Sequence, residues 1–229
     1  SVLFARTQAW SDQFTMATSA VRHHPESPRA RFFLARAYEY PVEQSQDLTR
    51  DQKIGLLSAA REQYKAMLAL DPGALAPSVL LYFIDDIYFP GNPEREVWLD
   101  NIEKGSAKDK LSASDLNAMF SFFNCAVATC SLEDSRGNRI IENLGKSREF
   151  DALLLDYSWQ MHNQRSELAL EQLQILAQNF PGKTRVSYLL LDRAVQENNI
   201  GDMYQALVSI YRGDGRFRQL ARLQSLVAE

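Results

Sequence analysis

The segment Ala60–Pro72 reads AREQYKAMLALDP, and the fold that we expect for the whole chain follows from it. Ala60, Tyr64, Met67 and Leu68 are spaced by four, three and one residues, which places all four side chains on one face of a helix. The Asp-Pro pair at the end of the segment is expected to stop this helix, because proline cannot continue it.

The same order of residues resembles the end of the second helix of a tetratricopeptide (TPR) repeat. Arg31, Leu34, Ala35 and Tyr38 fall where a TPR first helix carries its W, L, G and Y residues, and Gly201–Leu207 (GDMYQAL) resembles the opening of a TPR second helix. The resemblance implies an all-α fold, a TPR-like right-handed α-solenoid. Its helical hairpins stack because no hairpin can bury its own apolar face alone.

We expect one elongated domain over residues 1–229. The TPR pattern is clear in the N-terminal repeats (1–91) and in the C-terminal repeats (158–229), which close with a capping helix at Arg216–Val227. It is degenerate in the helical middle (92–157).

The helix ends are predicted from proline and from capping residues. Pro41 is expected to end the helix that Pro28 begins, before an insertion that leads to the next helix. Ser131–Asn138 is expected to be a loop, followed by a short helix at Arg139–Leu144. Residues that can cap helices are Ser27, Asp47 or Thr49, Asn92, and Ser112 or Ser114.

The composition limits the possible functions. An apolar fraction of 45% is ordinary for a soluble globular protein, and a net charge of −4 argues against nucleic-acid binding. The sequence contains neither a transmembrane span nor a signal peptide. Because the chain begins at Ser1 rather than at methionine, we expect the parent protein to carry a targeting or membrane segment upstream of residue 1.

No catalytic motif is present among the nucleophile-elbow, Walker A, dinucleotide-binding and zinc-protease patterns. His23 and His24 are adjacent and point about 100° apart on a helix, and His162 is isolated. Asp85 and Asp86 could act as paired carboxylates, although such a pair more often forms a polar seam or a salt bridge. We predict that the protein is not an enzyme and has no catalytic residues, metal site or cofactor.

Three segments extend the resemblance to a narrower group, the C-terminal periplasmic TPR regions of bacterial polytopic membrane proteins of glycan assembly (O-antigen polymerase and TMTC types). They are Ala5–Glu39, Leu111–Cys130 and Ser166–Leu207. The resemblance implies a soluble extracytoplasmic domain at the periplasmic face of the inner membrane, where it would act as a scaffold for envelope polysaccharide assembly.

Cys125 and Cys130 are the only cysteines. They can be bridged if a helix ends between them, and the periplasmic location implied by the resemblance favours a disulfide. The alternative is a pair of buried thiols at a helix end.

The TPR resemblance also implies a concave groove lined by the first helix of each repeat. The residues that it places there are Arg29, Phe32, Arg36, Glu39, Arg185, Tyr188 and Asp192. Arginine beside an aromatic ring suits an extended peptide or an acidic C-terminus. The alternative is a solvated helix face with ordinary salt bridges, such as one formed by Arg36 and Glu39.

Three functions follow from these observations. The first is a non-catalytic scaffold that binds a protein or peptide partner outside the cytoplasm. The second is a freestanding cytoplasmic TPR adaptor or co-chaperone that binds a peptide tail. The third is a regulatory domain of a sugar-transfer enzyme that contacts glycan, which requires Trp10, Trp98 and Trp159 to be exposed for stacking on sugars.

Overall fold

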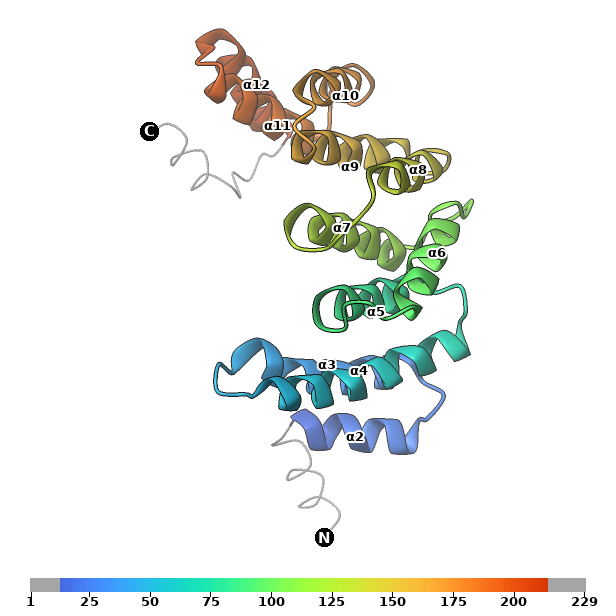
Figure 1. Ribbon diagram of the computed structural model, residues 1–229. Helices are drawn as coiled ribbons and strands as arrows, with labels where there is room; N and C mark the ends of the chain where they lie inside the picture. The colour runs from blue at the N-terminus through green and yellow to red at the C-terminus, as the bar shows by residue number, and fades with distance from the viewer. Residues whose placement is uncertain (1–12, 214–229) are drawn as a thin grey trace. The chain divides into compact units, whose positions relative to one another are not determined.

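The computed structural model describes residues 13–213, and within that range it consists of eleven helices and no strand (Figure 1). The all-α class expected from the sequence is therefore confirmed for this part of the chain. The helices are α2 (Gln13–His23), α3 (Pro28–Gln44), α4 (Arg50–Leu70), α5 (Leu75–Tyr88), α6 (Glu94–Ser106), α7 (Ala113–Ala128), α8 (Asp134–Gly145), α9 (Glu149–His162), α10 (Ser166–Asn179), α11 (Thr184–Gln196) and α12 (Ile200–Gly213). The predicted capping helix at Arg216–Val227 lies outside the described residues.

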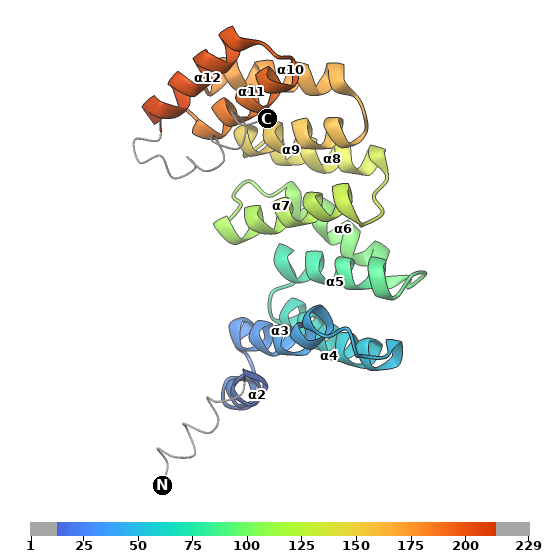
Figure 2. The same cartoon turned by 90° about the vertical axis from the view of Figure 1, so that its left-hand side faces the viewer.

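The described residues group into two compact units, which divide between Asn143 and Leu144. In the first unit α2 and α4 pack against α3, and α5 packs against α4, α6 and α7 (Figures 1 and 2). The apolar face predicted in Ala60–Pro72 is the face by which α4 is buried. Ala60 and Tyr64 have no exposed surface, and Met67 and Leu68 are also buried.

In the second unit α9 pairs with α10, α11 pairs with α12, and α10 contacts α11. Tyr188 and Leu191 of α11 pack against Ala206 and Ile210 of α12 to form a buried cluster. Because apolar residues recur every three or four positions on these helices, each helix presents one continuous stripe to its partner.

One turn geometry ends several helices. Where α4 ends, the backbone N–H of Asp71 bonds to Met67 O, and the N–H of Ala74 bonds to Asp71 O. The same pair of bonds recurs at the residue that follows α2 (His24), α5 (Phe89) and α10 (Phe180). Each of these four residues precedes a proline. Proline disfavours helical geometry in the residue before it, which explains why the helix stops there.

A second turn recurs in the C-terminal unit. Gln164 and Asn198 follow α9 and α11 with positive φ angles of 58° and 53°, as is common one residue past a helix C-terminus. The next residue in each turn, Arg165 or Asn199, donates its N–H to the carbonyl five positions back. The two turns lie 34 positions apart, and so do the starts and the ends of α10 and α12.

The predicted caps form at three helix starts. The Ser27 hydroxyl accepts the N–H of Ala30. Thr49 and Gln52 form a reciprocal capping box at the start of α4, and Ser112 and Asp115 form another at the start of α7.

Two predicted helix boundaries were wrong. Pro41 does not end α3, which continues to Gln44. The extra turn is held by the burial of Val42 and by the N–H of Ser45, which bonds to the carbonyl of Pro41. Residues 134–138 are not a loop, because α8 already begins at Asp134. Arg136 in its first turn forms ion pairs with acidic residues of α6, a long-range contact that local sequence patterns do not show.

Candidate functional site

The groove residues predicted at the start of α3 are only partly available to a ligand. Arg29 is exposed, and its guanidinium carbon lies 5.5 Å from the centre of the Phe33 ring, a cation–π contact. Phe32 is half-buried, with its ring centre 6.4 Å from that of Tyr64 on α4. Phe32 therefore contributes mainly to the contact between α3 and α4.

Arg36 and Glu39, further along α3, line a hollow of about 140 Å³ between α3, α4 and α5. The opposite wall comes from α5 and includes Leu80, Phe83 and Tyr88. Arg36 and Glu39 therefore share one hollow with residues of α5.

The charges in this hollow are partly paired. Arg36 donates to Glu39 and makes two bonds, of 3.0 and 3.2 Å, to the two carboxylate oxygens of Glu43. The Glu43 side chain remains 46% exposed, whereas that of Glu39 is 7% exposed. One guanidinium faces two carboxylates, so the wall carries a net negative charge.

Burial raises the pKa of Glu39, and the neighbouring Arg36 and Tyr64 oppose that shift. The Tyr64 hydroxyl is buried beside Glu39 without a hydrogen bond of normal geometry. Desolvation and the Glu39 charge raise the pKa of Tyr64. Tyr64 therefore stays neutral at physiological pH.

A second hollow of about 300 Å³ adjoins the first, and Tyr88 belongs to the wall of both. It is formed by the segment before α4, the first turn of α4 and the end of α5. Its cationic residues are Arg50, which is exposed, and Lys53, which is half-buried. Neither forms an ion pair within residues 13–213. We call the two hollows together the α3–α5 groove.

The apolar part of this groove faces solvent. Ile87 is 45% exposed and Tyr88 is 36% exposed, and Leu48, Ile54 and Pro90 lie around them. The sequence patterns did not identify these residues as part of a site. For Ile87 and Tyr88 the signal was the apolar composition of α5 on several faces, because a helix with one buried stripe needs fewer apolar residues.

The groove residues predicted on α11 are differently placed. Arg185 is exposed and Asp192 is half-buried, whereas Tyr188 is only 7% exposed and packs into the cluster between α11 and α12. The Asp192 charge contributes to raising the pKa of Tyr157 on α9, after the larger effect of burial. Tyr188 therefore has little surface to offer a ligand.

The C-terminal unit has two hollows of its own. One of about 370 Å³ lies between α10, α11 and α12, and one of about 260 Å³ lies between α9, α10 and α11. Arg193 and Glu197 line both and pair with each other at 2.7 Å. None of the α11 residues predicted for the groove lines either hollow.

Asp85 and Asp86 do not form a paired carboxylate site. Asp85 is fully buried and accepts hydrogen bonds from Arg61 (3.0 Å), Asn92 (3.0 Å) and Trp98 (2.8 Å). Asp86 instead accepts the Arg95 Nε–H at 2.6 Å. The two carboxylates therefore bind different partners, as expected for charged residues that hold neighbouring helices together.

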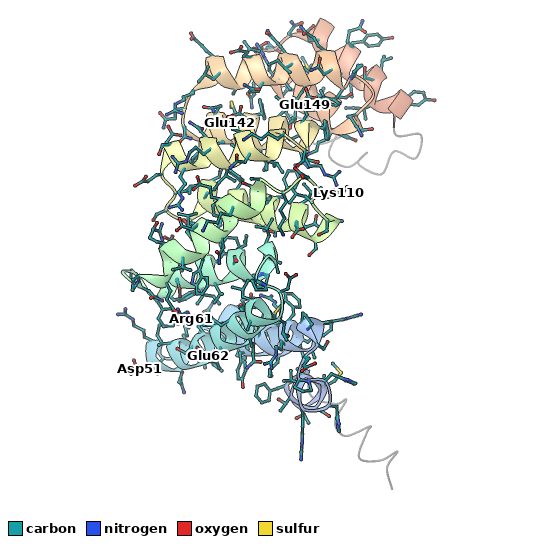
Figure 3. All side chains as sticks on the ribbon, turned by 90° about the vertical axis from the view of Figure 1, so that its right-hand side faces the viewer. Asp51, Arg61, Glu62, Lys110, Glu142 and Glu149 are labelled. Atoms are coloured by element: carbon teal, nitrogen blue, oxygen red, sulfur yellow. A yellow bond between two sulfur atoms is a disulfide. The ribbon has the colours of Figure 1, made fainter. Side chains whose placement is uncertain are left out.

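Arg61 extends this seam from Asp85 to Glu94, which Lys65 also contacts at 2.7 Å. Figure 3 labels Arg61 between the ribbons of α4 and α5. We call the set of Arg61, Lys65, Asp85 and Glu94 the α4–α6 seam.

Cys125 and Cys130 are joined by a disulfide that closes the last turn of α7. The residue that follows, Ser131, donates its N–H to Asp86, and its carbonyl accepts from Arg95 of α6. The disulfide and these bonds together hold the exit of α7 against α5 and α6.

The remaining candidates carry no site. His23 and His24 are exposed, and His162 stacks on Trp159. Trp98 and Trp159 are 8% and 2% exposed, so neither ring is available for stacking on a sugar, and Trp10 lies outside the described residues. Within residues 13–213 no group of acidic, histidine and cysteine side chains is arranged to hold a metal ion.

No protein-family model, curated protein or solved structure matches the chain. Within the described part of the chain, none of the helices has the length and apolar character needed to cross a membrane.

Proposed function

We propose that this chain is a non-catalytic protein-interaction scaffold built from TPR-like hairpins that stack as an α-solenoid. The recurring turns support this proposal. The proline turn ends α2, α4 and α10, and α10 and α12 repeat at an interval of 34 residues, which is the length of a TPR unit.

The α3–α5 groove is the binding site in this proposal, and an extended segment of a protein partner is the ligand. The observation that carries the proposal is the exposure of Ile87 and Tyr88 in a hollow that also holds charged side chains. Exposed apolar surface flanked by polar groups is typical of interaction sites. Stacked hairpins place such a surface on a rigid framework, which lowers the entropy cost of binding.

Selection of random peptides displayed on phage tests this proposal. Peptides enriched on the full chain should bind at least tenfold more weakly to Tyr88→Ser, because Tyr88 lines both hollows. Tyr40→Ser is the matched control. Tyr40 is 53% exposed on α3 and lines neither hollow, so this variant should bind as tightly as the unchanged chain. Equal binding to both variants would contradict the proposal.

We further propose that the scaffold is the extracytoplasmic domain of a bacterial membrane protein of envelope glycan assembly, at the periplasmic face of the inner membrane. The resemblance of Ala5–Glu39, Leu111–Cys130 and Ser166–Leu207 to that group supports this location. The bond between Cys125 and Cys130 also suits an oxidising compartment.

Thiol titration tests the location. The native protein, isolated under conditions that trap free thiols, should show no reactive cysteine under denaturing conditions. Two free thiols per chain would instead favour a cytoplasmic TPR adaptor, which would use the same groove.

A further inference from the structure

We propose that the α3–α5 groove selects a peptide segment in which an apolar side chain lies between an acidic and a basic side chain. This inference rests on the proposed function and deepens it, because it names the chemistry of the partner. It also changes the expectation from the sequence, in which Arg29 and Arg36 would bind an acidic tail.

The basic end of the groove is the first turn of α4. Arg50 and Lys53 have no ion-pair partner within the described residues, and both line the larger hollow. The positive end of the α4 helix dipole adds to their field. Asp51, on the same turn, is exposed and belongs to the wall of neither hollow. A carboxylate of a partner is the complementary group here.

The acidic end lies on α3. Arg36 is already engaged by Glu39 and by both oxygens of Glu43, so its charge is neutralised within the wall. Two carboxylates face this one guanidinium, and the exposed one is that of Glu43. A lysine or arginine of the partner is therefore favoured at this end, and a carboxylate is repelled.

The apolar centre joins the two ends. Tyr88 lines both hollows, Phe83 lies on the α3 side, and Ile87 lies on the α4 side. An apolar side chain laid over Tyr88 removes that ring from water and holds the two charged groups of the partner in register.

Partners with a single sign of charge are disfavoured by the same arrangement. A purely acidic segment places a carboxylate against Glu43, and a purely basic segment places a cation against Arg50 and Lys53. Selectivity of this kind arises from repulsion of the wrong partner as much as from attraction of the right one.

Three kinds of labelled peptide, all of equal length, test the inference by fluorescence anisotropy on the full chain. Each has blocked ends and the same leucine–phenylalanine centre. The flanks are acidic and basic in the first, acidic on both sides in the second, and basic on both sides in the third. The mixed peptide is tested in both orders of charge. In one of these orders it should bind at least tenfold more tightly than the doubly acidic peptide and the doubly basic peptide.

A charge-reversed variant makes the test specific to the site. Arg50→Glu/Lys53→Glu should lose the preference for the mixed peptide and bind the doubly basic peptide most tightly. The matched control is Lys104→Glu/Lys110→Glu, which makes the same change in net charge at exposed positions. Figure 3 shows Asp51, the neighbour of Arg50, and Lys110 at opposite edges of the view. The control should keep the original order of affinities.

The outcomes separate this inference from the proposed function. Equal binding of all three peptides, with a loss of binding in Tyr88→Ser, overturns the charge pattern and leaves the groove in place. A preference that persists in Arg50→Glu/Lys53→Glu overturns the inference as well. If the folded chain binds none of the three peptides, the inference fails, and the phage selection decides separately whether the groove binds any peptide.

Discussion

The α4–α6 seam and the α3–α5 groove use the same kinds of charged residues in opposite ways. In the seam, Asp85 has no exposed surface and the Arg61 side chain is 11% exposed, and each has its partners in place. In the groove, Arg50 is exposed and unpaired within residues 13–213, and Glu43 is 46% exposed. The seam holds helices together, whereas the groove leaves charged side chains exposed.

The presence of charged residues in the sequence therefore does not by itself indicate a candidate site in this chain. Asp85 and Asp86 are the most conspicuous acidic pair in the sequence, and the structure commits both to neighbouring helices. Arg50 and Lys53 follow an ordinary helix cap and belong to no motif. They are available to a ligand because the fold gives them no ion-pair partner within residues 13–213.

The largest effect is expected in the seam. Asp85→Ala should lower the free energy of unfolding by about 3–5 kcal/mol, because removing one partner leaves the buried guanidinium of Arg61 incompletely paired. Urea titration followed by circular dichroism measures this change. The control is Asp100→Ala. Asp100 pairs with Arg136 but is 56% exposed, so its loss should cost less than about 1 kcal/mol. Equal losses in the two variants would contradict the assignment of Asp85 to a buried seam.

The disulfide should have the next largest effect. Cys125→Ala/Cys130→Ala should lower the free energy of unfolding by about 2 kcal/mol, as expected for a cross-link that closes a short loop. Reduction of the unchanged chain should reproduce that loss. Peptide affinity should stay the same, because the bridge lies at the end of α7 and belongs to neither hollow of the groove. A tenfold loss of affinity on reduction would show that the bridge supports the groove.

The smallest effect is expected in the pH dependence of the free energy of unfolding, to which Glu39 and Glu94 should contribute with opposite signs. Burial raises the pKa of Glu39, so its contribution to stability is greatest below its ordinary pKa of 4.5 and is lost as pH rises through the raised value. The hydrogen bond from Lys65 lowers the pKa of Glu94, with a smaller effect of Arg61. The contribution of Glu94 is therefore present above pH 4.5 and is lost as pH falls through the lowered value.

Unfolding of the unchanged chain, Glu39→Gln and Glu94→Gln across about pH 3–7 measures both contributions. The stability of the unchanged chain relative to Glu39→Gln should fall as pH rises, and that relative to Glu94→Gln should increase. If both stability differences changed with pH in the same direction, Glu39 and Glu94 would have pKa values shifted in the same direction, which would contradict the account.

Local patterns predicted most of the helices and little of their long-range chemistry. The spacing of Ala60, Tyr64 and Leu68 and the caps at Thr49 and Ser112 depend on residues close in sequence, and the structure bears them out. Pro41 was misjudged because the burial of Val42 and the bond to Ser45 offset the proline. The start of α8 was missed because Arg136 is held by α6, which lies about 35 residues earlier.

The candidate site was only half predictable. Arg36 and Glu39 could be placed by the resemblance of their helix to a TPR first helix, because that resemblance depends on one helix alone. Glu43 lies on a turn that the sequence assigned to an insertion. Phe83 and Tyr88 come from α5, whose repeat pattern is weak. The neutralisation of Arg36 depends on Glu43 as well as on Glu39, which is why we propose a mixed ligand in place of an acidic one.

We propose that a partner binds in the α3–α5 groove. The most direct test is a titration of the isotope-labelled full chain with a selected peptide, followed by amide chemical shifts in NMR spectra. We predict shift changes concentrated in residues 36–57 and 80–90, including Arg50, Lys53 and Tyr88. Changes concentrated instead on α12, where Tyr204 and Tyr211 are 63% and 60% exposed, would contradict the account.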